Sequence, residues 1–176
     1  RAIGPDGVSF HHHEVVGARM TKARMEQLRY STDDVDTVTR LVELHLRFHT
    51  YKMGWTDRAV RRYVRDAGEH LARLNELTRC DCTTRNQRRA LELGARMDEL
   101  EVRIAELRER EELDAIRPEL DGTAVMARLG IGPGRAVGEA LTFLLDLRLD
   151  EGVLGEDEAG RRLDAWWRAR GADPAA

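Results

Sequence analysis

Apolar side chains recur at intervals of three and four along most of this sequence, which is the spacing that predicts amphipathic α-helices. From Val35 to Leu46 they follow a single helical stripe, which also includes His45. The longest pattern lies within 83–117, where successive apolar positions step by three and four: Ala90, Leu93, Met97, Leu100, Ile104 and Leu107. Such a narrow seam packs on another helix. No region is rich in alternating, strand-like segments, so the pattern predicts an all-α fold.

The first part of the chain is predicted to contain a turn at "GPDG" and then residues 8–10, which could finish an extended segment. A first helix is expected over 12–28, with Val15, Val16 and Met20 facing the core. The stretch "STDDV" then offers a hydroxyl N-cap followed by acids in the first turn, which predicts the start of a second helix.

Glycine, threonine and proline mark the boundaries of the later helices. Gly54 is a stop and Thr56 the next N-cap, and the helix from there is expected to reach Gly68, with another continuing to Thr78. The stretch "DCTTRNQ" begins the long helix and Pro118 closes it. At roughly 35 residues, this helix would measure on the order of 50 Å. A short helix, a glycine-rich turn and two further helices complete the prediction.

Composition limits the class of protein. The chain has 176 residues, 41% of them hydrophobic and 35% charged, with a net charge of -3. This is enough for one domain with a real core, or one domain and a small appendage. No apolar run approaches the roughly 20 residues of a membrane span, and the N-terminus is unlike a signal peptide. No membrane partner is therefore expected.

The two cysteines and the first residue bear on cellular context. Cys80 and Cys82 are too close for an ordinary disulfide and too few for a zinc site. They favour a reducing, cytoplasmic location. Arg1 in place of an initiator methionine favours a piece of a longer protein.

Positive charge is concentrated in one segment. Between Thr56 and Arg89 there are nine arginines against five acids, whereas Glu92 to Asp121 holds eleven acids and five arginines. Two arginine faces fall in the basic segment: Arg58, Arg61, Arg62 and Arg65, and then Arg85, Arg88 and Arg89. A charged face is usually only solvated, but two such faces with few compensating acids also fit the phosphates of RNA or DNA. Spacing alone leaves both interpretations open.

Histidines near the start of the chain raise the question of a metal site. The stretch "VSFHHHEVVGARM" has no linker after its three histidines, which argues against a purification tag. His45 and His49 share an apolar helical face further on. With Asp81, His13 and His45 are candidate ligands for a divalent metal, which requires three or more N or O ligands on rigid elements. Hydrogen-bonded histidines and an aspartate cap are the more ordinary explanation.

A glycine-rich turn, "LGIGPGRAVG", is the last candidate site. It places Gly132 and Gly134 before a helix N-terminus with Arg135 at the opening, an arrangement that can bind phosphate. The spacing is not that of a P-loop, and no strand precedes it. A plain tight connection between two helices explains the turn at least as well.

Five stretches in one order carry a resemblance to a known family. They are "FHHHEVVGARM", "RLVELHLRFH", "GWTDRAVRRYVRDAG", "LTRCDCTTRN" and "LDGTAVMARLGIGPGRAVGEAL". From about Gly7 to Trp167 the chain resembles the C-terminal half of bacterial CCA-adding tRNA nucleotidyltransferases, relatives of poly(A) polymerase, in their actinobacterial form.

The resemblance implies a division of work in the intact enzyme. A catalytic head that binds Mg²⁺ through carboxylates would transfer CMP and AMP from CTP and ATP to the 3′ end of tRNA, while helical body and tail regions hold the tRNA. The head motifs are absent from this sequence. The chain alone is therefore expected to be inactive and to need no cofactor, apart from a weakly bound divalent metal. Its expected partners are tRNA and the missing N-terminal head.

The resemblance also assigns residues and regions. His13, His45 and Asp81 match three ligands of the HD-type metal site of the family, whereas its early histidine and its His-Asp doublet have no counterpart. Arg128 and Arg135 lie in the tail motif, where phosphate contacts are expected. The implied regions are a partial HD-type helical region over 1–82, a long connecting helix over 83–117 and a helical tail domain over 118–176.

Two other functions stay open. The partial HD-type site could make the chain a metal-dependent phosphohydrolase acting on phosphomonoesters or 2′,3′-cyclic phosphates, with a metal-bound hydroxide as nucleophile. The chain could also be a helical scaffold that only contacts the missing head. Binding of tRNA would separate the first interpretation from the scaffold.

Overall fold

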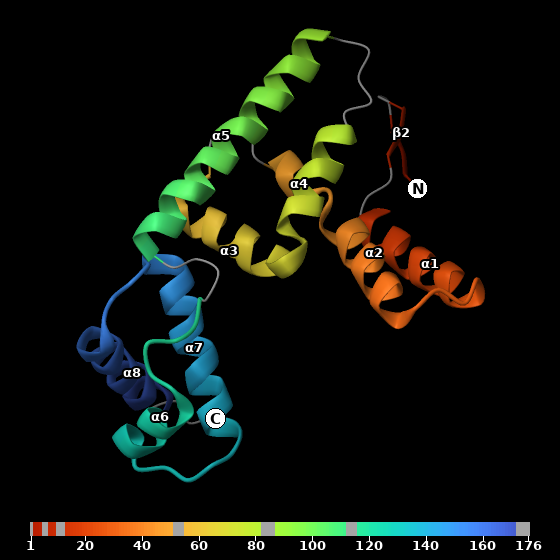
Figure 1. Ribbon diagram of the computed structural model, residues 1–176. Coiled ribbons are helices and arrows are strands. Elements are labelled where there is room, and N and C mark those ends of the chain that lie inside the picture. The colour runs from red at the N-terminus through yellow and green to blue at the C-terminus, as the bar shows by residue number, and fades with distance from the viewer. Residues whose placement is uncertain are drawn as a thin grey trace. The chain divides into compact units, whose positions relative to one another are not determined.

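The structure, a computed structural model, describes residues 2–4, 7–9, 13–50, 55–81, 87–111 and 116–171. It confirms the predicted all-α class (Figure 1). The exception among these residues is a two-stranded antiparallel hairpin at the start of the chain, in which Ile3 lies opposite Val8. Its strands are β1 (Ala2–Gly4) and β2 (Gly7–Ser9). Among the described helices, none combines the length and the apolar character needed to cross a membrane.

The helices follow the predicted order. They are α1 (His13–Gln27), α2 (Thr32–Leu44), the 3-10 turn η1 (Arg47–Thr50), α3 (Asp57–Ala67), the 3-10 turn η2 (Gly68–His70), α4 (Leu71–Cys80), α5 (Gln87–Glu111), α6 (Gly122–Leu129), α7 (Arg135–Glu151) and α8 (Glu156–Gly171). The hydroxyl of Ser31 caps α2 by accepting the N–H of Asp34 at 3.1 Å. The carboxylate of Asp121 caps α6 in the same way, accepting the N–H of Ala124 at 2.8 Å. These bonds satisfy backbone donors that a helix start leaves without partners.

Contacts divide the chain into two compact units, each made of two separate stretches. The first contains Arg1–Gly54 and Asp66–Val102, and the second contains Trp55–Arg65 and Arg103–Ala176. Helices α3 and α5 therefore contribute residues to both units. The division at 82 and 117 inferred from the sequence stays a prediction.

In the first unit, α1 packs along α2 through small side chains (Figure 1). Ala18 is buried, and a Cβ built on Gly17 would lie 3.4 Å from Val42. The prediction that three apolar residues of α1 face the core is wrong: Val15, Val16 and Met20 are 44%, 46% and 68% exposed. Each of the three therefore keeps a large exposed surface in the described structure.

The apolar seam of α5 is confirmed. Met97, Leu100, Ile104 and Leu107 are all at most 2% exposed, while the two residues at the start of the seam are partly buried. Helix α5 is described over Gln87–Glu111, inside the predicted 83–117. Residues 83–86 and 112–115 of the predicted helix lie outside the described residues. Ile116 and Arg117 are described and are not helical, so the helix does not run on to Pro118 as predicted. The seam therefore supplies buried residues to both units.

The core of the second unit lies between α6, α7 and α8. Its buried residues are Leu120, Val125, Ala140, Leu144, Ala159 and Leu163. Helix α6 ends at Gly130, whose φ of +65° is the left-handed conformation that glycine adopts without steric cost. The glycine-rich segment thus does connect two helices, as expected.

Candidate nucleic-acid interface

Arg61, one of the predicted RNA contacts on α3, lies inside the second unit. Arg61 is 6% exposed, and its guanidinium donates to both carboxylate oxygens of Glu111, at 2.7 and 2.8 Å. A third bond reaches the carbonyl of Leu149 at 3.3 Å. A cation held in this way joins α3 to the end of α5 and to α7, and it has little surface left for an RNA phosphate.

The Arg61 pair belongs to a larger internal network. Arg148, which is 8% exposed, donates to the backbone carbonyl of Glu111 at 2.9 Å and lies 3.8 Å from Glu119. Glu119 in turn accepts the N–H of Leu154 at 3.2 Å. Hydrogen bonding to Arg61 lowers the pKa of the Glu111 carboxyl below its ordinary value. The network therefore places opposite charges next to one another inside the second unit.

The other arginines of α3 differ in what they contact. Arg58 lies 2.9 Å from Asp150, and Arg62 lies 2.8 Å from the same carboxylate and 3.3 Å from Asp146. These two charges are therefore offset by acids of α7. Arg65 is exposed and makes no ion pair with any residue in the described part of the chain. Of the four, it is the one whose charge stays available.

The arginines outside α3 that were predicted to contact RNA also fall into two groups, those that point outward and those held in ion pairs. Arg88 and Arg135 have side chains 89% and 92% exposed, and within the described part of the chain each pairs with the glutamate one turn further on. Arg89 is exposed. Arg128 instead makes a two-fold hydrogen-bonded pair with Asp164, at 2.9 and 2.8 Å. Arg85 lies outside the described residues.

A glycine is required where the chain passes the Arg61 guanidinium. Gly152 has a φ of +87°, and a Cβ built on it would lie 2.8 Å from Arg61 Nη2. We expect Gly152→Ala to lower the free energy of unfolding by about 2–4 kcal/mol, because it adds backbone strain and displaces a buried, paired cation. Urea denaturation would measure this.

Gly155→Ala is the matched control for that prediction. Gly155 has a φ of +80° but nothing within 4 Å of its Cβ position, so it reports backbone strain alone. Its cost should be about 1–2 kcal/mol. Equal losses for the two variants would show that contact with Arg61 contributes nothing.

Two of the three predicted metal ligands come together. The rings of His13 and His45 have centroids 5.6 Å apart, tilted by 60°. His45 Nδ1 donates to the carbonyl of Val42 at 2.5 Å, which leaves Nε2 facing elsewhere. Asp81 sits at the C-terminal end of α4. No group of three His, Cys, Asp or Glu among the described residues is arranged to hold a metal ion, and the three-ligand set stays a prediction.

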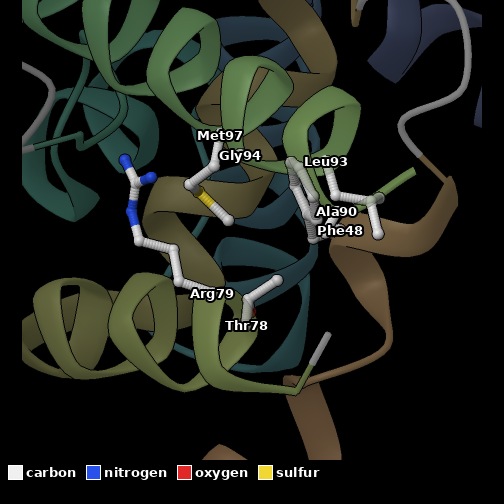
Figure 2. Close-up of a pocket in the computed structure, with 7 residues that line it drawn as sticks. All are labelled: Phe48, Thr78, Arg79, Ala90, Leu93, Gly94 and Met97. Atoms are coloured by element: carbon white, nitrogen blue, oxygen red, sulfur yellow. The ribbon is translucent and has the colours of Figure 1, made fainter. Parts of the chain in front are cut away.

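A pocket of about 330 Å³ lies between α4 and α5 in the first unit. Figure 2 shows Phe48 and Leu93 on one side of it and Arg79 on the other, with Met97 between them. Arg79 donates to Asp98 and Glu101, each at 2.7 Å. Two carboxylates against one guanidinium leave this side of the pocket with excess negative charge, so it does not suit a phosphate.

Sequence comparison finds that the chain is similar to enzymes of one class, the tRNA nucleotidyltransferases. It is 33% identical over 161 residues to the A-adding tRNA nucleotidyltransferase of Deinococcus radiodurans, covering 90% of this chain and 36% of that enzyme. It is 31% identical over 158 residues to the CC-adding tRNA nucleotidyltransferase of Thermus thermophilus, covering 89% of this chain and 33% of that enzyme.

The chain thus spans about a third of the length of the curated relatives that it matches. No family model matches the chain. No solved structure matches it. The similarity supports the resemblance inferred from the sequence motifs, while the actinobacterial form and the C-terminal position stay predictions.

Proposed function

We propose that this chain is a tRNA-holding helical region of a nucleotidyltransferase that acts on tRNA 3′ ends. The observation that carries this is similarity along about 90% of the chain to both an A-adding and a CC-adding tRNA nucleotidyltransferase. Two relatives that add different nucleotides share this region. Both relatives are named for their action on tRNA, so we assign tRNA binding to the region that they share.

Nucleotide transfer belongs to the rest of the intact enzyme in this proposal. The head would bind CTP, ATP and Mg²⁺, and this chain would position the tRNA. Contacts to the RNA backbone suit an enzyme that must accept many tRNA sequences, because backbone phosphates carry no sequence information.

Outward-facing arginines are the groups that would make those contacts. Arg65, Arg88 and Arg135 are exposed, and among the described residues each has at most a weak surface partner within its own helix. Arg61 has a structural role instead, because its charge is used inside the second unit. We therefore assign RNA contact to these three outward arginines and not to the whole arginine face of α3.

Fluorescence anisotropy with unfractionated tRNA tests this function. The chain should bind tRNA at low salt, and the affinity should fall linearly on a log–log plot against salt, with a slope of about -3 if three phosphates are contacted. Absence of binding at low salt would contradict the proposal.

A further inference from the structure

Three aromatic side chains gather on one face of the second unit, on α7 and α8. Phe143 and Trp166 are stacked, with ring centroids 5.0 Å apart and planes 14° from parallel. Trp167 follows, its ring 6.1 Å from that of Trp166. Each of these residues is half-buried.

Arginine is placed directly over this aromatic group. The guanidinium carbon of Arg170 lies 5.8 Å from the ring centroids of both Trp166 and Trp167, within the range of a cation–π contact. Arg170 also pairs with Glu139, and the other oxygen of that carboxylate accepts from Arg135 at 2.8 Å. Two arginines thus share one carboxylate, so these three side chains together carry a net positive charge.

Not all of these side chains are explained by folding. Phe143 and Trp166 pack against the buried core of the second unit. Trp167 and Arg170 are not part of that core cluster. A half-exposed tryptophan beside a partly exposed arginine provides a ring face and a planar cation together, which is the combination that proteins use to stack an unpaired nucleobase.

We propose that the surface formed by Trp167, Arg170, Glu139 and Arg135 binds an unpaired nucleotide of RNA. The base stacks on the tryptophan and guanidinium planes, and the flanking phosphate is attracted by Arg135. This rests on the proposed function and deepens it, because it states which structural element of a tRNA this surface recognises: an unstacked base and not a continuous duplex.

Three probes test the proposal on the whole 176-residue chain. They are unfractionated tRNA, a single-stranded RNA of about 12 nucleotides and a blunt duplex of the same sequence. Binding is followed by anisotropy of labelled RNA and by quenching of tryptophan fluorescence. Trp167→Leu removes the aromatic plane, Trp167→Phe restores one, and Val153→Ala removes an apolar group 58% exposed elsewhere in the same unit as a control.

The expected result is that Trp167→Leu weakens binding of single-stranded RNA and tRNA about ten-fold, the size of one lost base stack. Trp167→Phe and Val153→Ala should stay close to the parent chain, and duplex binding should not depend on residue 167. Circular dichroism confirms that each variant is folded. Unchanged affinity in folded Trp167→Leu would overturn the proposal.

The outcomes separate this inference from the proposed function. Binding of tRNA that does not depend on Trp167 leaves the function standing and removes the stacking surface. If single-stranded RNA binds in a Trp167-dependent way but tRNA does not bind, the stacking surface stands and the proposed tRNA-holding function is removed. Absence of binding to every RNA removes both. Tighter, Trp167-dependent binding of an oligoproline peptide would identify the surface as a peptide site and overturn the RNA assignment.

Discussion

Replacing Arg61 by methionine is expected to lower the free energy of unfolding by about 3–5 kcal/mol, because it leaves the carboxylate of Glu111 buried without its cation. The two side chains are 7% and 12% exposed, so water screens the pair weakly. The loss should be visible as an earlier midpoint in urea denaturation. Replacing an arginine that only binds RNA from a solvated face would lower the free energy of unfolding by less than about 0.5 kcal/mol.

A double variant distinguishes a broken pair from lost packing. Arg61→Met combined with Glu111→Leu removes both charges, and it should recover much of the stability that Arg61→Met loses. If the double variant is as unstable as the sum of the two single variants, the ion pair is not the cause.

Acid titration gives an independent reading of the same pair. The pKa of Glu111 is lower in the folded chain than its ordinary value of 4.5. Its contribution to stability is therefore present above that ordinary value and is lost as the pH falls through the lowered pKa of the folded state. The parent chain should lose this part of its stability on acidification, whereas the double variant should not.

The helix boundaries and the apolar seam of α5 were predictable from local features of the sequence. The N-cap at Ser31, the turn at Gly130 and the three–four spacing from Met97 to Leu107 each depend on near neighbours in the chain. Predictions from these signals were correct because helix capping and helical periodicity depend on residues that are close in the sequence. The predicted burial of Val16 and Met20 was wrong because it depends on which elements pack against that face of α1. The spacing of apolar residues does not reveal those elements.

The candidate site was predictable only in part, for a related reason. Arg58, Arg61, Arg62 and Arg65 have the same charge and the same local sequence environment. Their roles differ because their partners lie up to 88 residues away in the sequence. Arg62 pairs with Asp150, and Arg61 pairs with Glu111. Helical spacing shows that four arginines share a face, and it cannot show which acids lie across from them. His13 and His45 were already candidate ligands from their residue type, and the family pattern assigned both to one site; their ring centroids lie 5.6 Å apart.

Removing the outward arginines is expected to have the largest effect on RNA binding. The triple variant Arg65→Ala, Arg88→Ala, Arg135→Ala should weaken tRNA binding about ten-fold or more, and it should reduce the salt slope by about three, one unit for each lost phosphate contact. Helix content should be kept, since alanine is the best helix former. Anisotropy across a salt series measures both effects.

A charge-matched triple variant tests whether position or net charge is responsible. Arg58→Ala, Arg62→Ala, Arg128→Ala removes the same formal charge, but each of these arginines is paired with an aspartate of its own unit. Because those carboxylates already offset the positive charge, the salt slope should change by less than about one unit. Equal losses in the two triple variants would mean that tRNA responds only to total charge. A larger loss in the paired set would mean that RNA binding breaks these ion pairs and that the α3 face does contact the phosphates.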